Sequence, residues 1–318
     1  MYNVTLDQGC WKRPVKVLER DCADFPRTLR IKLNPTPKLY CCGNMALLNK
    51  PSLAIVGSRR PTRYGEQIAY GIGKRCAQLG IVVVSGLARG IDVAAHKGAL
   101  DNGGETIAVL GNGIDVIYPK ENQKVQEDIA EKGLLVSEYE LGMQPRAYHF
   151  PKRNRIISGL CQGVVIVQAE ARSGSLITAE AAIEQGCEVF AVPGNINDKL
   201  SMGPNHLISE GANIVAAIDD IFENVEEFRQ ILNEIKMDIG SDLGSYALET
   251  VGESEFCESY RNLSGLEKQL VKFLSGGEVT LDVLSQESGL PICKLGGIIT
   301  VLEMKGIVYC QMGKIGIK

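Results

Sequence analysis

Residues 53–65 of the chain read Leu53-Ala-Ile-Val-Gly-Ser-Arg-Arg-Pro-Thr-Arg-Tyr-Gly65. The apolar run at the start is too short for a helix, and it leads into a glycine turn that carries three arginines. A helical pattern follows over residues 66–78. Strand, glycine turn and helix in this order are typical of one unit of an α/β sheet.

The same kind of apolar run returns at regular spacing after this unit. The runs are rich in Val and Ile and mostly free of polar residues, as expected of strands buried on both faces of a parallel sheet. They begin at Ile81, Thr106, Leu134, Val164, Glu188 and Asn213. Helical patterns lie between them at residues 122–132, 153–160, 175–185 and 204–210. The sequence therefore predicts a doubly wound, mostly parallel α/β sheet over residues 52–235.

The segments on either side of this region have a different character. Residues 1–51 show no strong periodicity and are predicted to be an N-terminal extension. Residues 236–260 are polar and acidic, which is typical of a linker. Residues 261–318 contain three helical patterns followed by two strand-like runs, so a small C-terminal winged-helix domain is predicted.

The composition narrows the function classes. The chain is 45% hydrophobic with a net charge of −4 at pH 7, which excludes a largely disordered chain and a strongly basic nucleic-acid coat. Any polyanion site must therefore be a local cluster of cations. No apolar run reaches the ~18 residues that cross a bilayer, and no signal peptide is recognisable, so a cytoplasmic protein without membrane contact is expected. The ten cysteines form no C-x-x-C pair, so reduced thiols and no metal site are expected.

The turns at the carboxyl ends of the predicted strands are the candidate sites, because ligands of doubly wound sheets bind there. Five of these turns combine cations with glycine, serine or aromatic residues. Their candidate residues are Gly57, Ser58, Arg59 and Arg63; Ser85, Gly86 and Arg89; Lys120; Phe150, Lys152, Arg153, Asn154 and Arg155; and Ser173, Gly174 and Ser175. Each turn alone also fits a plain structural role, such as a helix cap or a core aromatic beside solvated charges.

Taken together, the turns favour binding over catalysis. Glycine turns at helix starts present backbone N–H groups to anions, and arginine adds charge-assisted hydrogen bonds. Aromatic rings between cations suit single-stranded nucleic acid, where bases stack and phosphates meet positive charge. The chain has no G-x-G-x-x-G in the right context, no P-loop and no recognisable acid–base pair. The pattern predicts a surface for an extended polyanion, without a cofactor.

The turns lie within longer motifs. These are Ile55-Val-Gly-Ser-Arg59, Ser85-Gly-Leu-Ala-Arg-Gly-Ile-Asp92, Ala108-Val-Leu-Gly-x-Gly113-Ile-Asp115-x-x-Tyr118-Pro119, Phe150-Pro-x-Arg153-Asn154-Arg155-Ile156-Ile157, Ala171-x-Ser-Gly-Ser-Leu-Ile-Thr-Ala179 and Val192-Pro-Gly194. Together, over about residues 22–235, they resemble the DNA-processing protein A (DprA/Smf) family. The resemblance implies an extended Rossmann-type domain that binds and protects single-stranded DNA and loads the RecA recombinase during natural transformation, in competent cells. It also implies a homodimer without enzymatic activity.

The resemblance also implies roles for particular residues. Arg59 and the turn before it resemble a loop that grips phosphate, and Phe150 corresponds to an aromatic residue that contacts a base. The residues that correspond to a charged pocket are Lys120, Arg153, Asn154, Arg155 and Ser173 to Ser175. A stretch near the family's dimer and recombinase contacts contains His206, Leu207 and Ile208. The helical N-terminal domain of many members is not expected, since residues 1–51 are too few to form it.

Two other functions remain open on these residues. The architecture also resembles nucleotide-binding phosphoribohydrolases, whose P-G-G-x-G-T-x-x-E motif is echoed, without the P-G-G, between Ser173 and Glu180. The chain could instead be an adaptor with little affinity for DNA. The third helix predicted for the winged-helix domain offers only Lys294 and Lys305 as cations, which favours a protein contact over duplex binding.

Overall fold

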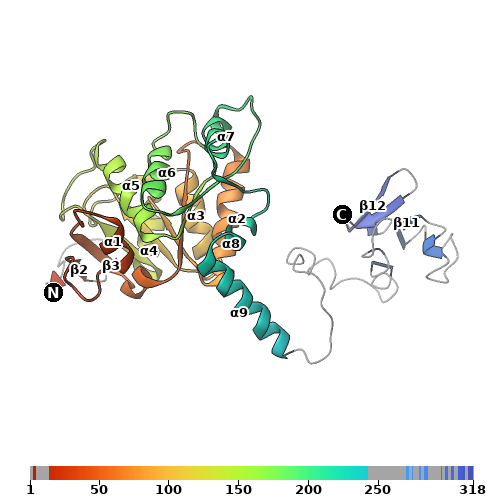
Figure 1. Ribbon diagram of the computed structural model, residues 1–318, viewed down its shortest axis with the longest axis horizontal. Coiled ribbons are helices and arrows are strands. Elements are labelled where there is room, and N and C mark those ends of the chain that lie inside the picture. Colours follow the sequence, from red (N-terminus) through yellow and green to blue (C-terminus); the bar gives the residue numbers. More distant parts are fainter. Residues whose placement is uncertain are drawn as a thin grey trace. The chain divides into compact units, whose positions relative to one another are not determined.

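The computed structural model divides the chain into two compact units, Met1–Asp242 and Leu243–Lys318. It describes residues 3–4 and 14–242 of the first unit. In the second unit it describes residues 270–271, 274, 279–280, 283–285, 295, 298–299, 302–303, 307–311 and 314–317. Each unit is described by itself (Figure 1).

The strands described in the first unit form one ten-stranded sheet in the order β1-β2-β3-β7-β6-β5-β4-β8-β9-β10. From β7 to β10 all neighbouring strands are parallel. These strands are β4 (Ser52–Val56), β5 (Val82–Ser85), β6 (Thr106–Leu110), β7 (Leu134–Ser137), β8 (Gly163–Ile166), β9 (Glu188–Ala191) and β10 (Asn213–Ile214). The predicted fold class, a doubly wound and mostly parallel sheet, is therefore confirmed.

The order of the parallel strands defines where a ligand can enter. Strand β4 pairs with β5 on one side and with β8 on the other. The chain builds β5, β6 and β7 outward from one side of β4, and then returns to build β8, β9 and β10 from the other. The strand order thus reverses between β4 and β8, and the crevice outside their carboxyl ends is the usual ligand site of such sheets.

Three antiparallel strands extend the sheet beyond β7. They are β1 (Asn3–Val4), β2 (Val15–Leu18) and β3 (Leu39–Gly43), with β3 paired to β7. Helix α1 (Arg27–Lys32) and the 3₁₀ turn η1 (Met45–Asn49) complete this region. The sequence pattern reveals none of these strands, because they are short and their apolar residues follow no clear period. Residues 15–18 and 39–43 nevertheless belong to the same sheet as β4.

Helices cover both faces of the sheet (Figure 1). Alternate residues of β4 point to opposite faces, with Leu53 and Ile55 in one core cluster and Ala54 and Val56 in another. The first cluster packs α2 (Arg63–Leu79), α3 (Ile91–Leu100), α8 (Asp220–Glu223) and α9 (Glu226–Asp242). The second packs α1, α5 (His149–Leu160), α6 (Leu176–Glu184) and α7 (Met202–Ser209). A third cluster lies under α4 (Gln123–Lys132), and the short turns η2 (Lys120–Asn122) and η3 (Lys199–Ser201) precede α4 and α7.

Local chemistry explains the first of these helices. The Thr62 hydroxyl caps α2 by accepting a hydrogen bond from the Gly65 N–H at 3.3 Å. Gly80 ends α2 in the left-handed region at φ 67°, where glycine is favoured because it has no Cβ. The helix α2 therefore starts directly after the arginine-rich turn and fixes the position of that turn relative to β4.

The described part of the second unit agrees with a winged helix. Its strands β11 (Val279–Thr280), β12 (Val308–Gln311) and β13 (Lys314–Ile317) form an antiparallel sheet in the order β11-β13-β12. Apolar residues of the helical positions and of these strands form its own buried cluster. The segment predicted as a linker, 236–260, starts inside α9, and residues 243–260 lie outside the described part of the chain, as do Lys294 and Lys305.

Two further expectations concern the whole chain. Among the described residues, no helix has the length and apolar character needed to pass through a bilayer. None of the six cysteines whose side chains the structure describes is in a disulfide; Cys22 is partly exposed and the other five are buried.

Candidate nucleic-acid interface

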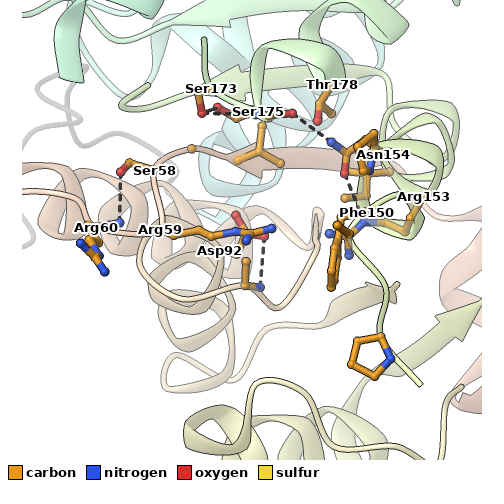
Figure 2. A pocket seen from close by; sticks show the side chains of 18 of the residues that line it. Ser58, Arg59, Arg60, Asp92, Phe150, Arg153, Asn154, Ser173, Ser175 and Thr178 are labelled. Carbon is orange, nitrogen blue, oxygen red and sulfur yellow. Dashed lines mark hydrogen bonds between the residues drawn. The ribbon is translucent and has the colours of Figure 1, made fainter. Parts of the chain in front are cut away.

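A cavity of about 680 Å³ lies at the carboxyl ends of β4 and β8, at the point where the strand order reverses. Figure 2 shows how side chains from the turn after β4, from α3, from α5 and from the start of α6 face this space. Nine of the residues predicted from the sequence line it, namely Gly57, Ser58, Arg59, Phe150, Arg153, Asn154, Ser173, Gly174 and Ser175. Segments that are far apart in the sequence thus meet at one site.

The turn after β4 holds its conformation through backbone hydrogen bonds. The Ser58 N–H donates to the Gln168 carbonyl at 2.6 Å, and the Ser58 hydroxyl accepts from the Arg60 N–H at 3.1 Å. A Cβ at Gly57 would lie 2.8 Å from the Gln168 oxygen, so only glycine fits there. The turn therefore presents the Arg59 side chain to the cavity from a fixed backbone.

Arg59, Phe150 and Tyr118 form the aromatic wall of the cavity. The guanidinium carbon of Arg59 lies 5.3 Å from the centroid of the Phe150 ring, within the range of a cation–π contact. The rings of Tyr118 and Phe150 have centroids 5.6 Å apart. A Cβ at Gly111 would come 2.7 Å from Cδ1 of Phe150, so the absence of a side chain there makes room for the ring. Arg59 is exposed and has no ion pair in the described part of the chain.

Arg153 has a different environment. Its side chain is 4% exposed, and its guanidinium donates to the Gly86 carbonyl at 2.9 Å and to the Val109 carbonyl. Its Nε donates to Oδ1 of Asn154 at 3.2 Å. Burial lowers the pKa of Arg153 to about 10, although Asp92 acts in the opposite direction. Arg153 therefore holds the ends of β5 and β6 against α5, and most of its donors are already used.

The turn before α6 forms the opposite wall. The Asn154 amide donates to the Gly174 carbonyl at 3.1 Å, and the hydroxyls of Ser173 and Ser175 lie 2.8 Å apart. Gly174 is exposed, and a Cβ there would meet no atom within 4 Å. At the start of α6 the N–H groups of Leu176 and Thr178 already donate to the Ser173 and Ser175 carbonyls, at 3.1 Å and 3.0 Å. The turn therefore offers an anion mainly the two serine hydroxyls.

Asp92 is a buried carboxylate in this cavity that the sequence did not single out. It is 5% exposed, and its Oδ2 accepts hydrogen bonds from the Gly86 N–H at 3.1 Å and the Ala88 N–H at 3.3 Å. These bonds bracket Leu87, which has a positive φ of 55°. Burial raises the pKa of Asp92, and the nearby charges of Arg153 and Arg59 oppose this shift. Only its place in the Ser85–Asp92 motif could have drawn attention to it.

Further cations at the rim were also missed. Arg60 and Arg146 line the cavity, and neither has an ion pair in the regions that the structure describes. Arg146 instead donates to the Tyr148 hydroxyl at 3.0 Å. The exposed carboxylate of Glu170 also borders the cavity. Their sequence signal was weak, because exposed charges in loops are common.

Gly86 and Arg89 line a small cavity beside the main one, together with Arg59, Phe150 and Arg153. The exposed Arg89 forms an ion pair with Glu121. A Cβ at Gly86 would lie 2.6 Å from Cζ of Arg153, so glycine is required where the buried guanidinium approaches the backbone.

The remaining predicted residues lie outside the cavity. Arg155 and Lys152 face Glu138, at 2.6 Å and 3.5 Å from its Oε1. The Ser85 hydroxyl is buried and donates to the Ile55 carbonyl at 2.6 Å, which is a structural role. Arg63 and Lys120 are exposed and line neither cavity.

The three residues predicted at a dimer or recombinase contact lie on α7. The His206 imidazole is exposed and lies 3.4 Å from Glu210. Leu207 is 7% exposed and packs in the core, with Ile208 partly buried against it. Of the three side chains, only His206 is largely open to a partner.

Comparison with known proteins identifies the family. The family model for DNA recombination-mediator protein A matches residues 16–226, and the DprA winged helix domain matches residues 258–314. The chain belongs to the DprA/Smf family. This confirms the resemblance drawn from the motifs and the winged-helix prediction. The match to the first model includes β2 and β3, so the N-terminal strands belong to the family's domain.

Individual DprA/Smf proteins are similar in sequence to this chain over most of this region. DNA processing protein DprA of Streptococcus pneumoniae is 50% identical over 192 residues, which are 59% of this chain and 66% of the relative. Protein Smf of Escherichia coli is 37% identical over 308 residues, 96% of this chain and 78% of the relative. Among solved structures, that of the S. pneumoniae protein covers 66% of this chain at 46% identity with a TM-score of 0.64, and 74% of that structure is matched. A structure of DNA processing protein A from Helicobacter pylori, whose subject is its binding of single-stranded DNA, has a TM-score of 0.61 and 34% identity over 70% of this chain and 97% of that one.

Proposed function

We propose that this chain binds single-stranded DNA in the cavity at the ends of β4 and β8. The observation that carries the proposal is the contact of the unpaired Arg59 guanidinium with the Phe150 ring at 5.3 Å, on the wall of a 680 Å³ cavity. An aromatic ring and a free guanidinium in contact provide the two features that an unpaired nucleotide needs, a stacking surface and a phosphate partner.

The geometry favours an unpaired strand over a duplex. A concave site that receives a base beside an aromatic ring and a guanidinium requires the base to leave its stack, which costs least in a single strand. Arg60 and Arg146, which have no ion pair among the described residues, line the same cavity and offer positive charge to the phosphates next to such a base. The opposite wall offers the two serine hydroxyls to a phosphate oxygen.

Family membership supports the wider role. The solved structure of the H. pylori relative concerns its binding of single-stranded DNA, and the family is named for mediating recombination. We extend this to a role in DNA processing during natural transformation, in which a homodimer protects the strand and hands it to the RecA recombinase without catalysing a reaction. A test of the hand-over is RecA filament formation on single strands coated with a single-strand-binding protein, with and without the chain.

Binding is tested with a fluorescent oligonucleotide of mixed sequence at two salt concentrations. Phe150→Ala is expected to weaken binding by about 1–3 kcal/mol, or about five- to 150-fold, because one base can no longer stack. Arg59→Glu should weaken it further and reduce the salt slope by about 0.7 for each phosphate that the variant no longer neutralises. Arg27→Glu changes the charge equally at an exposed position on α1 that lines neither cavity, and should have no effect. Equal affinity of all four proteins would refute the site.

The same preparation addresses the enzymatic alternative. The chain is incubated with nucleoside monophosphates, and free base is measured by chromatography. Steady release of base that is abolished in a variant of the cavity would replace the binding proposal with a phosphoribohydrolase-like activity. We expect no turnover, while the oligonucleotide binds.

A further inference from the structure

We propose that Asp92 reads the base that enters the cavity, by accepting hydrogen bonds from base N–H groups, and that the site therefore prefers guanine to thymine. This inference rests on the proposed binding of single-stranded DNA at the same cavity. It adds a choice among bases to a site whose other features recognise any nucleotide.

The first step of the argument is the position of the carboxylate. Asp92 is the second residue of α3, is 5% exposed and borders the cavity that also contains Phe150. In Figure 2 it lies beside Arg59, on the side of the cavity where the Phe150 ring stands. A base stacked on this wall would bring its edge close to the carboxylate.

The second step is that only half of this carboxylate is used by the protein. Oδ2 accepts the N–H groups of Gly86 and Ala88 at 3.1 Å and 3.3 Å. Among the described residues, Oδ1 accepts no hydrogen bond, and the carboxylate has no ion pair. Oδ1 is not fully enclosed by protein atoms either, so this oxygen is open to the cavity that Asp92 lines.

The third step concerns the cations around it. The guanidinium of Arg153 is committed to the Gly86 and Val109 carbonyls, and that of Arg59 lies against the Phe150 ring. Neither comes within ion-pair distance of Asp92 in the part of the chain that the structure describes. A carboxylate that is desolvated in this way gains most from a ligand that brings hydrogen-bond donors, because such donors replace the water that burial has removed.

The bases differ in what they offer to a single acceptor. Guanine presents N1–H and the N2 amino group side by side, with its O6 acceptor on the far side of N1, so an oxygen placed between the two donors meets no acceptor. Thymine has one ring N–H between two carbonyl oxygens, which repel a carboxylate. Adenine and cytosine are intermediate, since each has an amino group next to a ring nitrogen acceptor. The expected order of affinity is guanine, then adenine and cytosine, then thymine.

The preference for guanine is tested by comparing oligonucleotides that differ in their bases. Wild-type protein is titrated with labelled strands of equal length containing thymine alone, or thymine with isolated guanines that cannot form quadruplexes. We expect the strand with guanine to bind about five- to tenfold more tightly. Replacing guanine by inosine, which lacks the N2 amino group, should remove part of this gain. Replacing it by O6-methylguanine, which lacks N1–H, should do the same.

The protein side of the test uses Asp92→Asn. The amide oxygen of asparagine can still accept the two backbone N–H groups, while its amino group replaces the free oxygen with a donor. The variant should lose the preference for guanine over thymine. Asp101→Asn makes the same change at the exposed C-terminal end of α3, outside both cavities, and should keep the preference.

The outcomes separate the two proposals. Equal binding of all strands by wild type, or a guanine preference that survives in Asp92→Asn, overturns the role of Asp92 and leaves single-strand binding intact. If wild type binds none of the strands, the proposed function fails, and the reading of bases fails with it. Because the inosine and O6-methylguanine strands are tested on wild type, the inference stays open to refutation even if Asp92→Asn does not fold.

Discussion

Replacing Arg153 with methionine is expected to destabilise the first unit, although the motif places this residue among the DNA contacts. Methionine has a similar length and keeps the apolar part of the packing, but it has no donors. The substitution leaves the carbonyls of Gly86 and Val109 without the guanidinium that now binds them. It also removes a positive charge that favours the ionised form of Asp92.

The magnitude follows from these contacts. A hydrogen bond from a charged group contributes about 1.5–3 kcal/mol, so two such bonds at a residue that is 4% exposed contribute about 3–6 kcal/mol. Methionine avoids the cost of burying a charge, which offsets part of this loss. A net loss of about 3 kcal/mol is expected. In a unit of this size each kcal/mol changes Tm by roughly 2–4 °C, so Tm should fall by about 6–12 °C.

The assay pairs Arg153→Met with Arg59→Met. Tm is measured by circular dichroism, and affinity for a single strand is measured well below both transitions. Arg59 is exposed and its guanidinium lies against the Phe150 ring, so Arg59→Met should keep the Tm of wild type and weaken binding. An Arg153→Met protein with unchanged Tm and greatly reduced affinity would show that the buried guanidinium acts on DNA, and it would refute the structural role.

Three further predictions come from the same region. Gly86→Ala should lower both Tm and affinity, since the alanine Cβ would lie 2.6 Å from Cζ of Arg153. Thermal melts and binding titrations that match those of wild type would contradict this. Burial raises the pKa of Asp92 in the folded state above its pKa in the unfolded chain, so wild type should lose stability as pH rises from the unfolded-state pKa through the folded-state pKa. Tm measured between pH 4 and pH 8 should therefore fall less in Asp92→Asn than in wild type, and parallel curves would contradict this. Glu138→Gln frees Arg155 from its acidic partner, so affinity at low salt should rise if the strand follows α5, and an unchanged affinity would place that helix outside the path of the DNA.

Much of the fold was predictable because its signals are local. A short Val- and Ile-rich run such as Leu53–Val56, followed by a glycine and a helix cap, indicates a buried parallel strand whatever lies elsewhere in the chain. Residues 15–18 and 39–43 gave no such signal, because these strands are antiparallel and owe their place to pairing with each other and, for residues 39–43, with β7. Pairing between distant segments leaves little trace in one sequence.

The sequence predicted the location of the candidate site better than it predicted the role of each residue. The sequence places Arg59 and Arg153 in similar glycine- and cation-rich motifs, yet one side chain is exposed against a ring and the other is buried under two carbonyls. Burial depends on how far α5 packs into the sheet, which no local pattern reveals. Asp92 was overlooked for the same reason, since a carboxylate at a helix start usually has only a capping role.

The distribution of ion pairs explains how an acidic chain can present a binding site for a polyanion. The chain has a net charge of −4, and some cations outside the cavity, such as Arg89 and Arg155, are paired with carboxylates. Arg59, Arg60 and Arg146 have no such partner among the described residues, and all three border the same cavity. This cluster of three arginines attracts a phosphate backbone to the cavity, while the net negative charge of the chain opposes binding elsewhere. The acidic balance of the chain thus favours binding at the cavity over scattered contact.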